Sequence, residues 1–171
     1  EEYPLFLSYV LSFALLFTYW RAHSYLISTY AKNIDWTFSN MNAVFFLFVA
    51  LVPFSSHLLG LYSENQFAVF IIGLNTVAIG FTLYIMRNYI IKAETIDNVA
   101  FTPKDLRHST IRTMVPVFCA LLAIILSFFN ITAALTLFTI AILFNFFAYT
   151  TDVIDKIFFQ KHIIIEEKGK S

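Results

Sequence analysis

The side chains that could do chemistry in this sequence are few and stand apart from one another. The four histidines are His23, His57, His108 and His162. They have no metal-ligand spacing with one another or with carboxylates. The motifs of metalloproteases, serine hydrolases and nucleotide-binding loops are absent, as is a cysteine cluster. We therefore predict no enzyme activity and no catalytic, cofactor-binding or metal site.

The polar residues inside apolar segments also lack the pattern of a proton relay or of a carbonyl selectivity filter. Asp152 and Asp155 are the only carboxylates near an apolar run, and both lie at its polar end. Proton-coupled transporters place such groups deeper in the membrane. A TVGYG-like filter is missing. Asn75 and Thr76 lie in mid-segment, where hydrogen bonding between helices is the expected role.

Composition places these residues in a membrane protein. Hydrophobic residues make up 59% of the chain, and the mean hydropathy of +0.74 excludes an ordinary soluble domain. Charged residues are only 13%, and they gather between the apolar runs. The formal net charge is zero, so no nucleic-acid partner is indicated. We expect membrane lipid as the surrounding partner and no small-molecule substrate.

The apolar runs predict an all-α, polytopic membrane protein formed by one transmembrane domain over residues 1–171. About 20 apolar residues cross the hydrocarbon core of a bilayer. The last charge-free run is about twice that length, and Asn130 divides it into two helices. The predicted spans are about 4–30, 36–61, 66–91, 110–129 and 131–159. Pro53 is expected to kink the second of them, because proline removes a backbone donor.

Charge distribution predicts the orientation of these five spans. Threading them in order places all 11 Lys and Arg residues on one face. By the positive-inside rule that face is cytoplasmic, together with the linker 92–109 and the tail 160–171. The N-terminus would then lie outside without a signal sequence. We therefore expect that a first helix is missing, so that five transmembrane helices are present of an inferred six.

Two stretches resemble the second and third helices of the transmembrane protein 175 family, the potassium channels of lysosomes and their prokaryotic relatives. They are YVLSFALLFTYWRAHSYLI and NMNAVFFLFVALVPFSSHLLGLY. The matching positions are Ser12-Phe13, Trp20, His23, Asn42, Pro53-Phe54 and Leu58-Leu59-Gly60. Two positions depart from the pattern: Ser24 replaces a second histidine, and Ala22 replaces an asparagine.

The resemblance implies a function and an assembly. Prokaryotic-type members have six helices per subunit, form homotetramers and line the pore with their first helix. Bulky apolar side chains on that helix form the constriction. The resemblance implies that Trp20, His23 and Asn42 support the missing pore helix through hydrogen bonds, and that potassium is the permeant ion. In the family, the first helix has the signature Arg-x-x-x-Phe-Ser-Asp. Phe38-Ser39-Asn40 looks like part of this signature, but it precedes Asn42 and Pro53, which match the third family helix, so we treat the likeness as a coincidence.

We therefore expect a subunit of a potassium-permeable cation channel with a hydrophobic constriction, in the plasma (inner) membrane of a prokaryote. Two other readings stay open. A secondary transporter or permease component would show inverted repeats and a broken mid-membrane helix, and the sequence shows neither. A non-transporting membrane scaffold would need no ion ligand.

Overall fold

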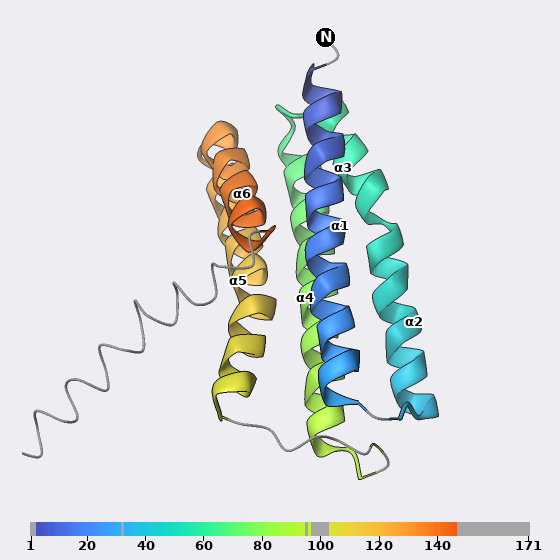
Figure 1. The fold of residues 1–171 in the computed structure, drawn as a ribbon. Coiled ribbons are helices and arrows are strands. Elements are labelled where there is room, and N and C mark those ends of the chain that lie inside the picture. The colour runs from blue at the N-terminus through green and yellow to red at the C-terminus, as the bar shows by residue number, and fades with distance from the viewer. Residues whose placement is uncertain (1–2, 32, 95, 97–102, 147–171) are drawn as a thin grey trace, which may run out of the picture.

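The protein is a bundle of long helices that run side by side (Figure 1). The computed structural model describes residues 3–31, 33–94, 96 and 103–146. These residues form helices and no strand, so the predicted all-α class is confirmed for them. The helices are α1 (Tyr3–Tyr30), α2 (Trp36–Ala50), α3 (Val52–Leu61), α4 (Gln66–Lys92), α5 (Pro103–Ser127) and α6 (Ile131–Phe146).

The segment predicted as one helix over 36–61 is divided in the structure. α2 ends at Ala50, and α3 begins at Val52 after a single residue, Leu51. The Leu51 N–H donates to the Phe48 carbonyl at 3.1 Å, which tightens the last turn of α2. Pro53 in the first turn of α3 has no N–H to donate to the turn before it. The break therefore lies where the proline interrupts the backbone hydrogen bonds.

The last two helices differ in extent from the predicted spans. α5 begins at Pro103, within the predicted linker 92–109, where the run Thr102-Pro103-Lys104-Asp105 predicts a helix start ahead of the membrane span, and it ends at Ser127. The described part of α6 ends at Phe146, so the rest of the predicted span 131–159 and the tail 160–171 lie outside the described residues. Residues 97–102 of the linker lie outside them as well.

α4 is the central helix, and it packs against α2, α3 and α5. Two of its glycines allow the close approach of α5. A Cβ at Gly80 would lie 2.3 Å from Val117 Cγ2, and one at Gly73 would lie 2.7 Å from Ile124 Cγ1. Either distance is shorter than real carbon–carbon contacts. The close spacing of α4 and α5 therefore requires glycine, which has no Cβ, at both positions.

Asp35 fixes the loop between α1 and α2 to the end of α4. Its Oδ1 accepts a hydrogen bond from the Phe38 N–H at 2.8 Å, which caps α2 as expected for aspartate. Its Oδ2 accepts from the Tyr89 hydroxyl on α4 at 2.5 Å. One carboxylate thus starts α2 and holds that helix end against α4.

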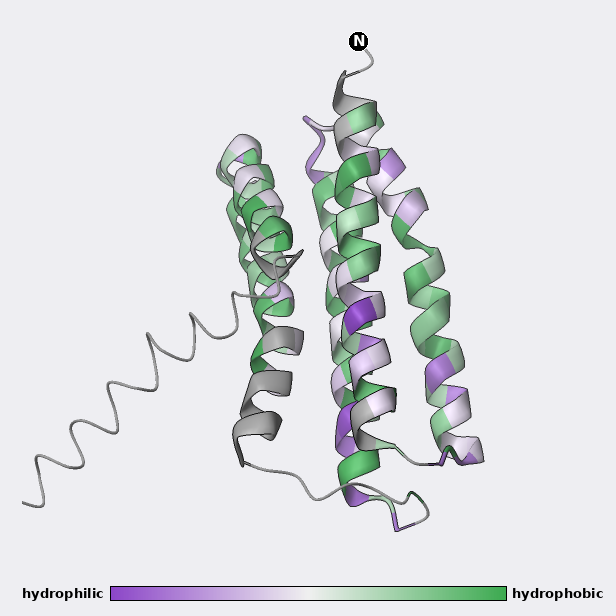
Figure 2. Cartoon of the chain, in the orientation of Figure 1, coloured by the Kyte–Doolittle hydropathy of each residue, from purple (hydrophilic) through white to green (hydrophobic). Residues whose placement is uncertain are grey.

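Hydropathy follows the length of the bundle (Figure 2). Hydrophobic residues dominate the helix shafts, and hydrophilic residues gather in the loops and toward the lower ends of α1, α2 and α4. Among the described residues, Trp36–Leu61 and Gln66–Lys92 are long and apolar enough to cross a membrane. The other three predicted crossings stay predictions.

Candidate functional site

A hydrogen-bonded pair of predicted site residues joins α1 to α2. His23 Nε2 lies 2.6 Å from Asn42 Oδ1, and the His23 side chain is only 7% exposed. An amide oxygen only accepts hydrogen bonds, so with this orientation Nε2 carries the hydrogen. The imidazole also stacks on Phe45, with ring centroids 4.7 Å apart and planes 7° apart. Phe46 meets its edge at 5.2 Å.

Trp20, three residues before His23 on α1, differs from it in exposure. Its side chain is 59% exposed, and its ring packs on Phe17 at a centroid distance of 5.8 Å. Phe17 also lies 6.2 Å from Phe13 and beneath the guanidinium of Arg21 at 5.8 Å. Trp20 therefore belongs to a largely exposed aromatic row, whereas His23 and Asn42 form a partly buried contact.

Asn75 makes the contact between helices that its mid-segment position suggested. Its Nδ2 donates to Ser55 Oγ on α3 at 3.3 Å. Ser55 Oγ lies in turn 3.0 Å from the Leu51 carbonyl oxygen and 3.1 Å from the Val52 carbonyl oxygen. The Ser55 hydroxyl thus donates to backbone carbonyls at the α2–α3 break. The Pro53 break and the Asn75 amide are thus linked through one serine.

Thr76 uses its side chain within its own helix. Its Oγ1 donates to the Ile72 carbonyl at 2.8 Å. The bond between helices at this level comes instead from Tyr19 on α1, whose hydroxyl donates to the Thr76 backbone carbonyl at 3.1 Å. Sequence reasoning missed Tyr19, although it lies one helical turn before His23 on the buried side of α1.

Two buried polar atoms at the α3–α4 level have no hydrogen-bond partner among the described residues. They are Asn75 Oδ1 and Ser56 Oγ. Ser56 follows Ser55 directly on the buried stripe of α3 that also contains Val52 and Leu59. A buried polar atom without a hydrogen bond lowers the stability of the fold, so some hydrogen-bonding capacity at this level is unused.

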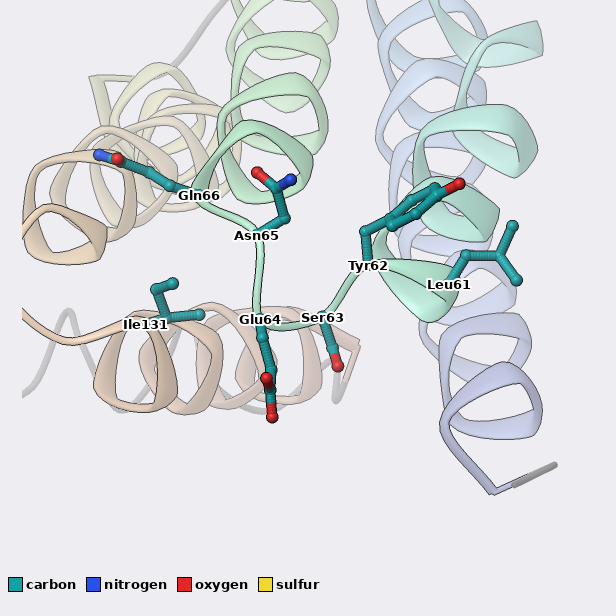
Figure 3. Close-up of a pocket in the computed structure, with 7 residues that line it drawn as sticks. All are labelled: Leu61, Tyr62, Ser63, Glu64, Asn65, Gln66 and Ile131. Atoms are coloured by element: carbon teal, nitrogen blue, oxygen red, sulfur yellow. The ribbon is translucent and has the colours of Figure 1, made fainter.

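The loop between α3 and α4 borders an open hollow of about 580 Å³ (Figure 3). Its lining runs from Leu61 to Gln66 and adds Ile131 from α6. Glu64 is the only charged lining residue, and the labelled polar side chains spread in different directions. A ligand site needs convergent polar groups, so this hollow is a weak candidate. No cluster of three metal-ligating side chains occurs in the part of the chain that the structure describes.

The N-terminal third of the chain matches a known protein family. Residues 1–53 match the family model described as endosomal/lysosomal potassium channel TMEM175. The resemblance predicted from the sequence is confirmed over these residues. The match covers Trp20, His23, Asn42 and Pro53, whereas Asn75 and Thr76 lie outside it. No curated protein and no solved structure matches the chain.

Proposed function

We propose that the chain is a subunit of a homotetrameric, potassium-permeable cation channel whose pore narrows at a hydrophobic constriction. The observation that carries the proposal is the match of residues 1–53 to a potassium channel family. Membrane-length apolar segments support the same assignment. The permeant potassium ion would need no bound cofactor, since a hydrophobic constriction selects by pore width and by the cost of dehydration.

The described helices would act as the scaffold of the pore. The partly buried His23–Asn42 pair fixes α1 against α2. Asn75 fixes α3 against α4, and Tyr19 fixes α1 against α4. Trp20 and the exposed aromatic row on α1 offer a surface for a pore helix or a neighbouring subunit, since exposed apolar patches often mark interfaces. In this proposal Trp20, His23 and Asn42 support the pore helix.

The proposal includes a place for the protein in the cell. The subunit would lie in the plasma (inner) membrane of a prokaryote, with the 92–109 linker and the 160–171 tail in the cytoplasm. The basis is the one-sided distribution of the 11 Lys and Arg residues.

Electrical recording of the full-length protein tests the function. In a planar bilayer with a potassium gradient and no other solute, we expect a current that reverses at the potassium equilibrium potential. A current that requires a coupled substrate would identify a secondary transporter instead. A silent bilayer from protein that still forms tetramers by native mass spectrometry would identify a scaffold and overturn the proposal.

A further inference from the structure

One face of α2 contacts the His23 imidazole in three different ways. Asn42, Phe45 and Phe46 stand at positions i, i+3 and i+4 of the helix, so their side chains share that face. Asn42 supplies the hydrogen-bond acceptor, Phe45 lies against the flat side of the ring, and Phe46 meets its edge. Because the three contacts differ in kind, each can restrict a different property of the imidazole.

Phe45 restricts the plane of the ring. The second side-chain torsion of histidine is broad, so the first torsion alone does not fix that plane. The two rings lie 7° from parallel with centroids 4.7 Å apart, so a tilt of the imidazole about this torsion would drive it into Phe45. Phe45 has little room to move aside, since it is 1% exposed and lies with Phe38 on the buried stripe of α2.

The Asn42 amide restricts which ring atom faces it. A half-turn of the imidazole in the same plane would exchange Nε2 with the carbon Cε1, and the hydrogen bond to Asn42 Oδ1 would be lost. Because the amide oxygen only accepts, the bonded Nε2 carries the hydrogen, and Nδ1 of the neutral ring is left as an acceptor. The plane and the tautomer of His23 are therefore fixed together when both contacts are made.

We propose that Phe45 is a positioning residue that acts through His23. It holds the imidazole in the plane from which Nε2 bonds Asn42, so that His23 offers the pore helix a single tautomer. This role rests on the proposed function, in which His23 supports that helix. Phe46 contributes less, because its ring is 47% exposed and is free to move away from the imidazole edge.

NMR of the full-length protein in lipid bilayers, with isotope-labelled histidine, tests the state of the ring. The chain has four histidines, and His23→Gln identifies the His23 signals by their loss. In the wild type we expect one neutral tautomer with the hydrogen on Nε2, and ring protons shifted upfield by the Phe45 ring current. A mixture of tautomers, or a hydrogen on Nδ1, would overturn the proposal without any variant of Phe45.

Substitutions on α2 provide the matched comparison. Phe45→Leu keeps an apolar side chain but removes the ring, so it should give a mixture of His23 tautomers, and Phe45→Tyr should restore the single one. Phe48→Leu removes a partly buried ring further along the same helix and should leave the His23 signals unchanged. Unchanged signals in folded Phe45→Leu, or an equal change in Phe48→Leu, would show that Phe45 only fills space.

Potassium current at a fixed protein-to-lipid ratio separates this inference from the function on which it rests. Phe45→Leu should lower the current about two- to tenfold, the range to which the energy of one aromatic pair corresponds. Phe48→Leu should conduct like the wild type. Mixed tautomers with an unchanged current in Phe45→Leu would overturn the positioning role. A silent wild-type protein would instead refute the proposed function, and the NMR spectra would still decide whether Phe45 fixes the ring.

Discussion

Two adjacent serines on α3 show that a buried hydroxyl can either stabilise or destabilise the fold, depending on its hydrogen bonds. Ser55 and Ser56 are each 1% exposed. Ser55 bonds the backbone at the α2–α3 break and accepts from Asn75, whereas Ser56 Oγ has no partner among the described residues. A buried hydroxyl stabilises only where its hydrogen bonds are made.

Alanine substitution should separate the two serines. Ser55→Ala removes a bonded hydroxyl and leaves the Asn75 amide without an acceptor, which should lower the free energy of unfolding by about 1–3 kcal/mol. Ser56→Ala removes an unpaired hydroxyl and should change it by less than about 1 kcal/mol. Thermal unfolding of both variants in the same detergent measures the difference. Equal losses would show that both hydroxyls are bonded.

The His23–Asn42 contact can be measured by a double-mutant cycle. Asn42→Ala leaves the buried His23 without its partner, and His23→Ala leaves the half-buried Asn42 without its partner, so each should cost about 1–3 kcal/mol. Because the two residues share one bond, the double variant should cost less than the sum by about 1 kcal/mol. Unfolding in detergent provides the values, with Ser39→Ala on the exposed side of α2 as a control. Strict additivity would mean that the bond does not form.

At the scale of elements, helix positions were accessible from the sequence, and several contacts between helices were not. Each long apolar run of the sequence lies mostly within described helices, as expected for segments that cross a bilayer, although α1, α4 and α5 also include charged residues such as Arg21, Arg87 and Lys104. Asn75 could be predicted as a polar residue between helices. Tyr19 could not, since its acceptor is the Thr76 backbone carbonyl and every residue has one. The family match ends at residue 53, so it gives no information about α4, and the contacts of α4 are known only from the structure.

The α4–α5 contact should be sensitive to one methyl group. Gly→Ala normally favours a helix by about 1 kcal/mol, but a Cβ at Gly80 would lie 2.3 Å from Val117 Cγ2 and 3.4 Å from the Thr113 carbonyl. Val117 is β-branched and cannot easily turn away. We expect Gly80→Ala to lower the unfolding temperature.

A second substitution tests the cause of that loss. Gly80→Ala combined with Val117→Ala should recover part of the stability, because the clashing methyl groups are gone. Gly73→Ala should cost less than Gly80→Ala, since its Cβ would lie 2.7 Å from Ile124 Cγ1, a less severe overlap than 2.3 Å from Val117 Cγ2. A loss that Val117→Ala does not relieve would place the strain in the backbone instead.

At the scale of the whole molecule, the loops divide between the two ends of the bundle. The α1–α2 loop and the end of α4 lie together at one end, and the α3–α4 loop lies at the other (Figure 1). Lys92 closes α4 at the first of these ends. By the positive-inside rule, the orientation proposed above predicts that this end faces the cytoplasm.

Cysteine accessibility in sealed vesicles checks this orientation. In a Cys119→Ser background, which removes the single native cysteine, Ile34→Cys, Glu94→Cys and Glu64→Cys each place one thiol at an exposed loop position. A membrane-impermeant maleimide added to right-side-out vesicles should label Glu64→Cys at once, and the other two only after the membrane is permeabilised. Labelling of all three from one side would show that α2, α3 and α4 do not cross the bilayer. Labelling of Ile34→Cys and Glu94→Cys alone would show the opposite orientation. The positive-inside rule would then not explain the orientation of this chain.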